Sequence, residues 1–204
     1  MSLISKGARE DRSTLDQIFI LTEIMAYRLE GGFGTYMAFI DVRKAYDRVW
    51  RPGLWTKLKD IGLGGRCHDL LRTMYSNVVR QVLIHGRLSE GVEVEAGVPQ
   101  GSVLSPFLYS IYIDGLHAAL RERGLGVSIF GRLVPLLFYA DDIVLLARSG
   151  AEIHEMLEVL DKYAPKWRFN VNHGKSKVMV GGTEAARAEA REDMAARRAA
   201  LGGC

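Results

Sequence analysis

The sequence predicts an α+β domain whose core strands and helices follow the order β-α-β-β-α-β. Three short apolar runs support this fold class. The run 36–40 ends at Asp41, and the runs 136–140 and 143–147 flank an Asp-Asp pair. Apolar runs of this length, bounded by polar or turn residues, are typical of buried strands. Stretches with apolar residues at helical spacing separate them, which is the pattern of a split β-α-β-β-α-β domain.

The first half of the chain is expected to alternate helices with short extended segments. Thr14 and Gln17 are spaced as a capping box at the start of a helix, which Gly31-Gly32 ends. Pro52 suits the first turn of a second helix, and Gly62 suits its end. The expected elements are a helix from 14 to about 30, a strand over 36–40, helices over 52–61 and 67–75, and a hairpin of 80–85 and 92–95 joined through Gly86.

The second half is expected to complete the sheet. The segment 97–106 is loop-like, and a long helix runs from Pro106 to about Arg123. Two strands then meet at a tight turn that contains Asp141-Asp142. Ser149 and Glu152 form a second capping box before another helix, and 178–180 is the last strand.

The composition excludes several classes of protein. The chain has 204 residues, 48% hydrophobic and 25% charged, unlike a collagen or a disordered acidic chain. Two cysteines cannot form a disulfide framework, so a reducing compartment is expected. No apolar run approaches the roughly 20 residues that a membrane span needs, and no targeting signal is visible, so we expect no membrane partner. A net charge of +3 is too small to indicate a nucleic-acid partner by itself.

Three carboxylates occupy positions that suit a metal site. Asp41 ends an apolar strand, and Asp141 and Asp142 interrupt an apolar hairpin. Like charges placed close together resist joint ionisation unless a positive partner compensates them, and Mg²⁺ prefers oxygen ligands. If the strand that ends at Asp41 lies beside the hairpin, the three acids meet at one sheet edge. Two ions held there would suit in-line phosphoryl transfer, because one activates a hydroxyl nucleophile and the other steadies the leaving pyrophosphate.

A simpler interpretation stays open for each acid. Asp is common in turns, so an Asp141-Asp142 pair alone is more often a surface turn between two strands. Asp41 alone is more often a strand terminator or a helix cap. The choice between these interpretations therefore depends on the segments that accompany the acids.

Five segments, taken in order, resemble the successive motifs of reverse transcriptases. They are RSTLDQIF (12–19), FIDVRKAYDRV (39–49), GVPQGSVLSP (97–106), FYADDI (138–143) and NVNHGKSK (170–177). They are most similar to those of non-LTR, LINE-like retrotransposons, which have Ala before the acid pair, as in this YADD sequence. The resemblance implies a polymerase palm with a ferredoxin-like core and partial helical fingers over residues 1–183. An Ala/Arg/Glu-rich tail, exposed as a helix or disordered, would then occupy 184–204.

The resemblance also implies roles for the acids and their neighbour. Asp41 and Asp141 correspond to the two principal metal ligands, and Asp142 corresponds to the adjacent acid that assists them. The backbone carbonyl of Val42 would face the metal on the triphosphate side. These residues would bind two Mg²⁺ ions, for which Mn²⁺ is a substitute.

Four further residues correspond to nucleotide-binding positions. Tyr46 matches the steric gate that excludes a ribose 2′-OH, although an aromatic core residue is the alternative. Gln100 and Gly101 match the loop that contacts the incoming nucleotide and the template, with a plain turn as the alternative. Lys175 matches a motif lysine near the pyrophosphate, with a solvated loop lysine as the alternative.

The function implied is that of an RNA-directed DNA polymerase, with an RNA template, a DNA primer and dNTPs as partners. Phosphate contacts would come from exposed arginines, for which Arg66, Arg72, Arg80 and Arg87 are candidates. The same family implies an intracellular location in a nuclear or cytoplasmic ribonucleoprotein. Because most of the fingers and the thumb are expected to be missing, activity of this chain alone stays open. The alternative function is a catalytically silent, retrotransposon-derived RNA-binding or interaction module.

Overall fold

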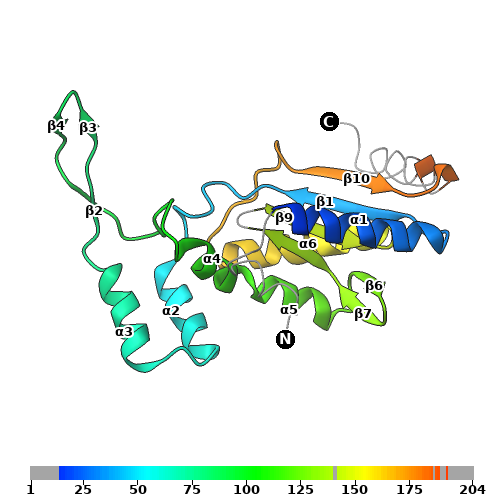
Figure 1. Ribbon diagram of the computed structural model, residues 1–204, viewed down its shortest axis with the longest axis horizontal. Helices are drawn as coiled ribbons and strands as arrows, with labels where there is room; N and C mark the ends of the chain where they lie inside the picture. Colours follow the sequence, from blue (N-terminus) through cyan, green and yellow to red (C-terminus); the bar gives the residue numbers. More distant parts are fainter. Residues whose placement is uncertain (1–13, 140–141, 186, 189–191, 193–204) are drawn as a thin grey trace.

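A four-stranded antiparallel sheet forms the centre of the fold, in the order β10-β1-β9-β8 (Figure 1). Its strands are β1 (Thr35–Ile40), β8 (Leu136–Tyr139), β9 (Asp142–Ala147) and β10 (Lys177–Gly181). The chain passes from β1 to β8 through a crossover connection, and β9 lies between these two strands in the sheet. This is the split β-α-β-β-α-β arrangement, so the predicted α+β class is confirmed. The computed structural model describes residues 14–139, 142–185, 187–188 and 192, so Asp141 and most of the 184–204 tail lie outside the described residues.

Helices cover both faces of this sheet (Figure 1). The described helices are α1 (Thr14–Glu30), α2 (Arg51–Asp60), α3 (Gly65–Met74), α4 (Ser105–Ile113), α5 (Gly115–Glu122) and α6 (Gly150–Lys166). Of these, α2 and α3 lie to one side of the sheet rather than on a face of it (Figure 1). Side chains alternate along a strand, so Ala38 and Ile40 face the large core that contains α4, α5 and α6, while Met37 faces a smaller core under α1. Both faces are therefore buried, which explains why the strands read as continuous apolar runs. Among the described helices, none combines the length and the apolar content needed to cross a membrane.

Lys57 of α2 lies in a cage of aromatic side chains between α2, α4 and α6. Its Nζ lies 3.8 Å from the centroid of the Trp167 ring and donates a hydrogen bond to the Tyr163 hydroxyl at 2.8 Å. It also donates to the backbone carbonyl of Tyr112. Burial lowers the pKa of Lys57 to about 8, although the nearby Asp114 carboxylate opposes this effect.

The predicted helix from Pro106 to about Arg123 is interrupted, and forms α4 and α5 with Asp114 between them. In a continuous helix the N–H of residue 116 would bond to the carbonyl of residue 112. Here Lys57 occupies the Tyr112 carbonyl, and the Tyr163 hydroxyl is hydrogen-bonded to the Leu116 backbone. Two side chains from other helices thus replace the backbone bond that would have joined α4 to α5.

Two hairpins extend from the body. The sequence analysis missed the first, β6 (Val127–Ile129) with β7 (Arg132–Val134), whose turn residues Phe130 and Gly131 both have positive φ. The predicted 80–95 hairpin forms with its turn at His85-Gly86, as two short ladders rather than two continuous strands. These ladders pair β2 (Val79–Arg80) with β5 (Val92–Glu93), and β3 (Leu83–Ile84) with β4 (Arg87–Leu88). Figure 1 shows this second hairpin projecting away from the sheet.

Candidate active site

Asp41 and Asp142 lie at the same end of two hydrogen-bonded strands. The last registered pair of β1 and β9 is Ile40 with Ile143, so the next step along this register places position 41 opposite position 142. Facing residues of an antiparallel pair are roughly 5 Å apart and point to the same face of the sheet. Both aspartates line one cavity of about 360 Å³, in which Asp41 is half-buried and Asp142 exposed. Asp141, the third predicted acid, lies outside the described residues.

Residues 170–176 hold the backbone of Asp41 on both sides. The Asn172 backbone N–H donates to the Asp41 carbonyl at 2.8 Å, and the Asp41 N–H donates to Ser176 Oγ at 3.2 Å. Ser176 Oγ in turn donates to the Asn172 carbonyl at 2.9 Å. The same carbonyl accepts the Lys175 N–H at 3.0 Å, and Lys175 lines the cavity with the two aspartates. The structure therefore brings together Asp41, Asp142 and Lys175.

The backbone of Val42 is oriented by the same segment. Val42 forms an isolated antiparallel bridge with Val171, and the bonds that make this bridge run from Asn172 to Asp41 and from Arg43 to Asn170. In this pattern the bridged residues themselves do not exchange hydrogen bonds. The carbonyl of Val42 is therefore directed away from Val171, toward the side of β1 on which β9 lies.

Helix α1 covers the sheet beside the acids. Gln17, Ile18 and Leu21 of α1 line the same cavity as the aspartates, opposite Phe39 of β1 and Val144 of β9. Phe39 and Val144 are half-buried against α1, so the cavity has an apolar floor with its carboxylates at the rim. Polar groups beside an apolar floor favour a ligand with a charged end and a flat or apolar part.

Tyr46, Gln100 and Gly101 line a second cavity, of about 420 Å³, together with Ser102 and Pro106. The structure thus brings these three predicted residues together, but in a cavity separate from that of the aspartates. Gly101 has a φ of +84°, which a glycine adopts without strain.

A row of aromatic rings connects the two cavities. The Tyr46 ring centroid lies 5.2 Å from that of Tyr109, which lies 5.9 Å from that of Phe138. Tyr46 lines the second cavity, and Phe138 lines the cavity of the aspartates. The buried Tyr109 ring therefore lies between a residue of one cavity and a residue of the other.

The donor atoms at the acid cavity suit a hard divalent cation. The two carboxylates offer only oxygen atoms, which are the donors that Mg²⁺ prefers, whereas Val42 is not among the residues that line this cavity. Within the described part of the chain there is no group of three or more His, Cys, Asp or Glu side chains placed to hold a metal. The third acid of the predicted set is Asp141, which that part does not include.

Sequence reasoning missed Ser176. Its hydroxyl accepts from the Asp41 N–H, 135 positions earlier in the sequence, and donates to the Asn172 carbonyl. Nothing in its spacing distinguishes it from an ordinary loop serine. The nearest signal was its place directly after Lys175, inside the segment that resembles a reverse transcriptase motif.

The comparisons with known proteins identify the family to which the chain belongs. Residues 3–195 match the reverse transcriptase (RNA-dependent DNA polymerase) family, and the chain belongs to that family. The predicted family is therefore confirmed.

Its relatives are proteins of non-LTR retrotransposons. The chain is 32% identical over 175 residues to the RNA-directed DNA polymerase from mobile element jockey of Drosophila funebris, with 83% of this chain and 19% of the relative covered. It is 30% identical to the probable RNA-directed DNA polymerase from transposon X-element of Drosophila melanogaster, with 83% and 18% covered. A Pol polyprotein from type-1 retrotransposable element R2 of Popillia japonica is 25% identical, with 87% and 30% covered. The chain thus spans about a fifth of the length of the first curated relatives that it matches.

Solved telomerase structures share the fold. Telomerase from Candida albicans, in complex with a fragment of telomeric RNA, superposes with a TM-score of 0.65 at 15% identity, covering 88% of this chain and 32% of that one. Apo telomerase from Candida tropicalis, truncated from its C-terminal domain, gives a TM-score of 0.62 at 19% identity, with 84% and 36% covered. At these identities the likeness supports the fold alone.

Proposed function

We propose that this chain is the catalytic palm of an RNA-directed DNA polymerase, which adds dNTPs to a primer 3′-OH on an RNA template with two Mg²⁺ ions. The observation that carries the proposal is the meeting of Asp41, Asp142 and Lys175 in one cavity at a sheet end, in a chain that belongs to the reverse transcriptase family. Within this proposal, residues 1–183 form the palm with partial fingers, and 184–204 form a separate tail.

The carboxylates of Asp41, Asp141 and Asp142, with the Val42 carbonyl, would hold the two ions. Bound there, Mg²⁺ supplies a lowered pKa for the primer hydroxyl and neutralises charge on the triphosphate. The hydrogen bonds from Asn172 and to Ser176 fix the backbone of Asp41, so the point from which its side chain extends is held before a ligand binds. Lys175 lines the same cavity, where its ammonium would steady the negative charge of the leaving pyrophosphate or donate a proton to it.

The second cavity would receive the sugar and base of the nucleotide. The Tyr46 ring, backed by Tyr109, presents a flat and poorly compressible surface beside Gln100 and Gly101. A ring at this place excludes a ribose 2′-OH by steric contact. Gly101 leaves the backbone open to close approach by a ligand, because no side chain covers it.

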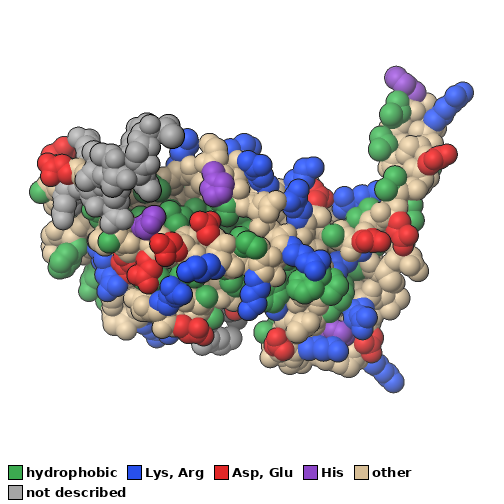
Figure 2. Space-filling model, turned by 180° about the vertical axis from the view of Figure 1, so that it is seen from behind, with side chains coloured by type: hydrophobic (Ala, Val, Ile, Leu, Met, Phe, Trp, Pro, Cys, Tyr) green, Lys and Arg blue, Asp and Glu red, His purple; other side chains and the backbone are tan. Residues whose placement is uncertain are grey.

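Nucleic acid would be gripped mainly through its phosphates, because a polymerase must accept any template sequence. Exposed cations lie on the segment after β1 and around the start of β10, namely Arg43, Lys44, Arg48, Lys175 and Lys177. Figure 2 shows Lys and Arg side chains along the middle of the molecule, up to the base of the projecting hairpin. Among the arginines predicted to contact phosphate, Arg80 already pairs with Asp47 at 3.3 Å.

Primer extension tests the proposal. We expect the wild-type chain to incorporate dTTP on poly(rA)/oligo(dT) with Mg²⁺, and Asp41→Asn to lose at least about 100-fold in rate, because it removes a metal-binding charge. Asp161→Asn is the matched control, since it makes the same change at an exposed position of α6 and should keep the wild-type rate. Mn²⁺ binding measured by electron paramagnetic resonance should weaken in Asp41→Asn only.

Equal incorporation by the wild type and Asp41→Asn would reject the assignment of Asp41 as a metal ligand. Absence of incorporation by either protein, together with RNA binding that weakens steeply with salt, would support the alternative of a catalytically silent RNA-binding module.

A further inference from the structure

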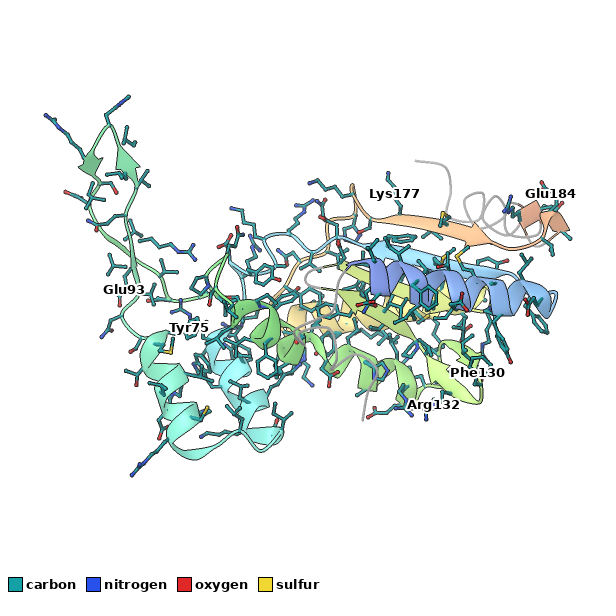
Figure 3. The ribbon with its side chains drawn as sticks, viewed as in Figure 1. Tyr75, Glu93, Phe130, Arg132, Lys177 and Glu184 are labelled. Carbon is teal, nitrogen blue, oxygen red and sulfur yellow. The ribbon has the colours of Figure 1, made fainter. Side chains whose placement is uncertain are left out.

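The projecting hairpin and the second cavity share one anchor. We define the arm as residues 76–96, which leave the body after α3 and return to it just before Gly97 (Figure 1). Tyr75 and Glu93 mark the two sides of its base in Figure 3. Gln100 and Gly101 follow the arm by only a few residues, so the place where the arm returns sets one wall of the cavity.

Arg51, at the start of α2, joins the two ends of the arm through backbone carbonyls. Its Nη1 donates to the Tyr75 carbonyl at 2.8 Å, before the arm, and to the Val94 carbonyl at 2.7 Å, at the end of the arm. Its Nη2 donates to Ala96 at 3.3 Å, and its Nε donates to Gly97 at 2.9 Å. A single guanidinium therefore binds four carbonyls on both sides of the arm.

Burying the Arg51 cation costs free energy, and a side chain that only filled space would not need a charge. The Arg51 side chain is only 7% exposed, and the ion pairs formed by the described residues do not include it. An apolar residue would fill the same space without removing a cation from water. Only a planar guanidinium offers five donors in a fixed fork that can reach several carbonyls at once.

The hydrogen bonds of Arg51 lead directly to the second cavity. Gly97, which accepts from Arg51, donates its N–H to the Val49 carbonyl at 2.9 Å, and Val98 donates to the Tyr46 carbonyl at 2.8 Å. The contact is close, because a Cβ on Gly97 would lie 2.6 Å from the Asp47 carbonyl oxygen. The segment that carries Tyr46 is thus hydrogen-bonded to the segment that leads to Gln100.

We propose that Arg51 is a positioning residue for the nucleotide cavity: it closes the base of the arm and so sets the spacing between Tyr46 and Gln100-Gly101. That the cavity receives a nucleotide rests on the proposed function, whereas the anchoring of the arm does not. Without Arg51, four buried or partly buried carbonyls lose their donor, and the return of the arm is no longer fixed.

Amide hydrogen exchange tests the anchoring in the full chain. In Arg51→Met we expect exchange of the Gly97 and Val98 amides to accelerate at least tenfold, with amides of β1 and β9 within twofold of the wild type. Arg51→Lys should give an intermediate acceleration, because one ammonium cannot reach both sides of the arm. Arg121→Met, at an exposed position of α5, is the matched control and should leave Gly97 and Val98 unchanged.

Kinetics test the link to the cavity. On poly(rA)/oligo(dT), Arg51→Lys and Arg51→Met should raise the KM for dTTP at least tenfold and lower kcat less than threefold, because the acid cavity is untouched. Unchanged exchange at Gly97 and Val98, or unchanged KM in both variants, would overturn the inference. Faster amide exchange throughout the sheet of Arg51→Met would mean that this variant is destabilised as a whole. In that case the exchange rates of Gly97 and Val98 and the KM for dTTP in Arg51→Lys decide the inference. A wild type without incorporation would defeat the proposed function, while the exchange rates would still decide the anchoring.

Discussion

Raising the pH from about 7.5 to about 9.5 should stabilise the folded protein, because Lys57 is buried among aromatic rings. Removal from water favours the neutral amine, and the nearby Asp114 only partly offsets this effect, so the pKa of Lys57 in the folded protein is about 8. The hydrogen bond to Tyr163 and the contact with Trp167 keep the amine at this place in the fold.

The size of the effect follows from the two pKa values. In the unfolded chain Lys57 has its ordinary pKa of 10.5. Below about pH 8 both states hold the proton, and the folded state bears the cost of the buried cation. Between the two values only the unfolded state holds the proton, so the free energy of unfolding rises with pH. The gap corresponds to about 3 kcal/mol, of which about 2 kcal/mol falls between pH 7.5 and 9.5.

Two buried tyrosines limit the useful pH range. Burial raises the pKa of Tyr112 and of Tyr163, so each stays neutral in the folded protein at a pH where it ionises in the unfolded chain. Their contribution to stability is therefore lost as the pH rises above about 10. Measurements up to pH 9.5 isolate the contribution of Lys57.

Urea unfolding followed by tryptophan fluorescence measures this effect in the wild type and in Lys57→Met. Subtracting the free energy of unfolding of Lys57→Met removes titrations that the two proteins share. The difference should shift in favour of the wild type by about 2 kcal/mol between the two pH values. A difference that stays constant within about 0.5 kcal/mol would refute the reasoning that burial lowers the pKa of Lys57.

Two further substitutions test the nucleotide cavity and the packing of α6. Tyr46→Ala should reduce the preference for dTTP over UTP, measured as the ratio of kcat/KM values, by at least about tenfold, because it removes the ring proposed to exclude the 2′-OH. An unchanged ratio would remove the steric-gate assignment. Glu152→Ala should lower the free energy of unfolding by about 2–4 kcal/mol, because its buried carboxylate accepts the backbone N–H groups of Gly126 and Arg148. Glu155→Ala, at an exposed position of α6, should cost less than about 0.5 kcal/mol in the same urea titration, and equal losses in the two variants would contradict this account.

The strands that carry the acids could be predicted from the sequence, because their burial on both faces leaves an uninterrupted apolar pattern. The run 36–40 gave β1, and the run 143–147 gave β9, which the structure extends to Asp142. The start of α6 was also predictable, since Ser149 Oγ accepts the Glu152 N–H at 3.2 Å, as its spacing indicated. These features depend on residues close together in the sequence.

The rest depends on contacts between distant segments. Glu152 does not complete the capping box, because its carboxylate binds Arg148 and the Gly126 N–H. The break between α4 and α5 depends on Lys57, about 55 positions upstream, which takes a carbonyl that local sequence assigns to the helix. The hairpin of β6 and β7 was missed because its strands are only three residues long and carry no clear alternation.

The candidate site likewise combines residues that the sequence motifs identified with contacts that only the fold shows. The motifs named Asp41 and Lys175, but only the fold shows that Ser176 and Asn172 hold the Asp41 backbone in place. Likewise, the sequence placed Tyr46 and Gln100 in one nucleotide-binding set with Lys175, whereas in the structure Lys175 lines the cavity of the aspartates and the other two line a separate one. A linear pattern identifies side chains by type, and it contains no information about which wall each one occupies.

The hydrogen bonds between Asp41 and residues 172–176 have a consequence for synthesis of the protein. During translation the first acid leaves the ribosome long before the segment that fixes its backbone, which is 135 positions later for Ser176. Until that segment has emerged, a nascent chain holds the carboxylate on an unfinished edge, with β10 still missing from the sheet. In the proposed function, the site would therefore bind a cation only after residues 172–176 have emerged.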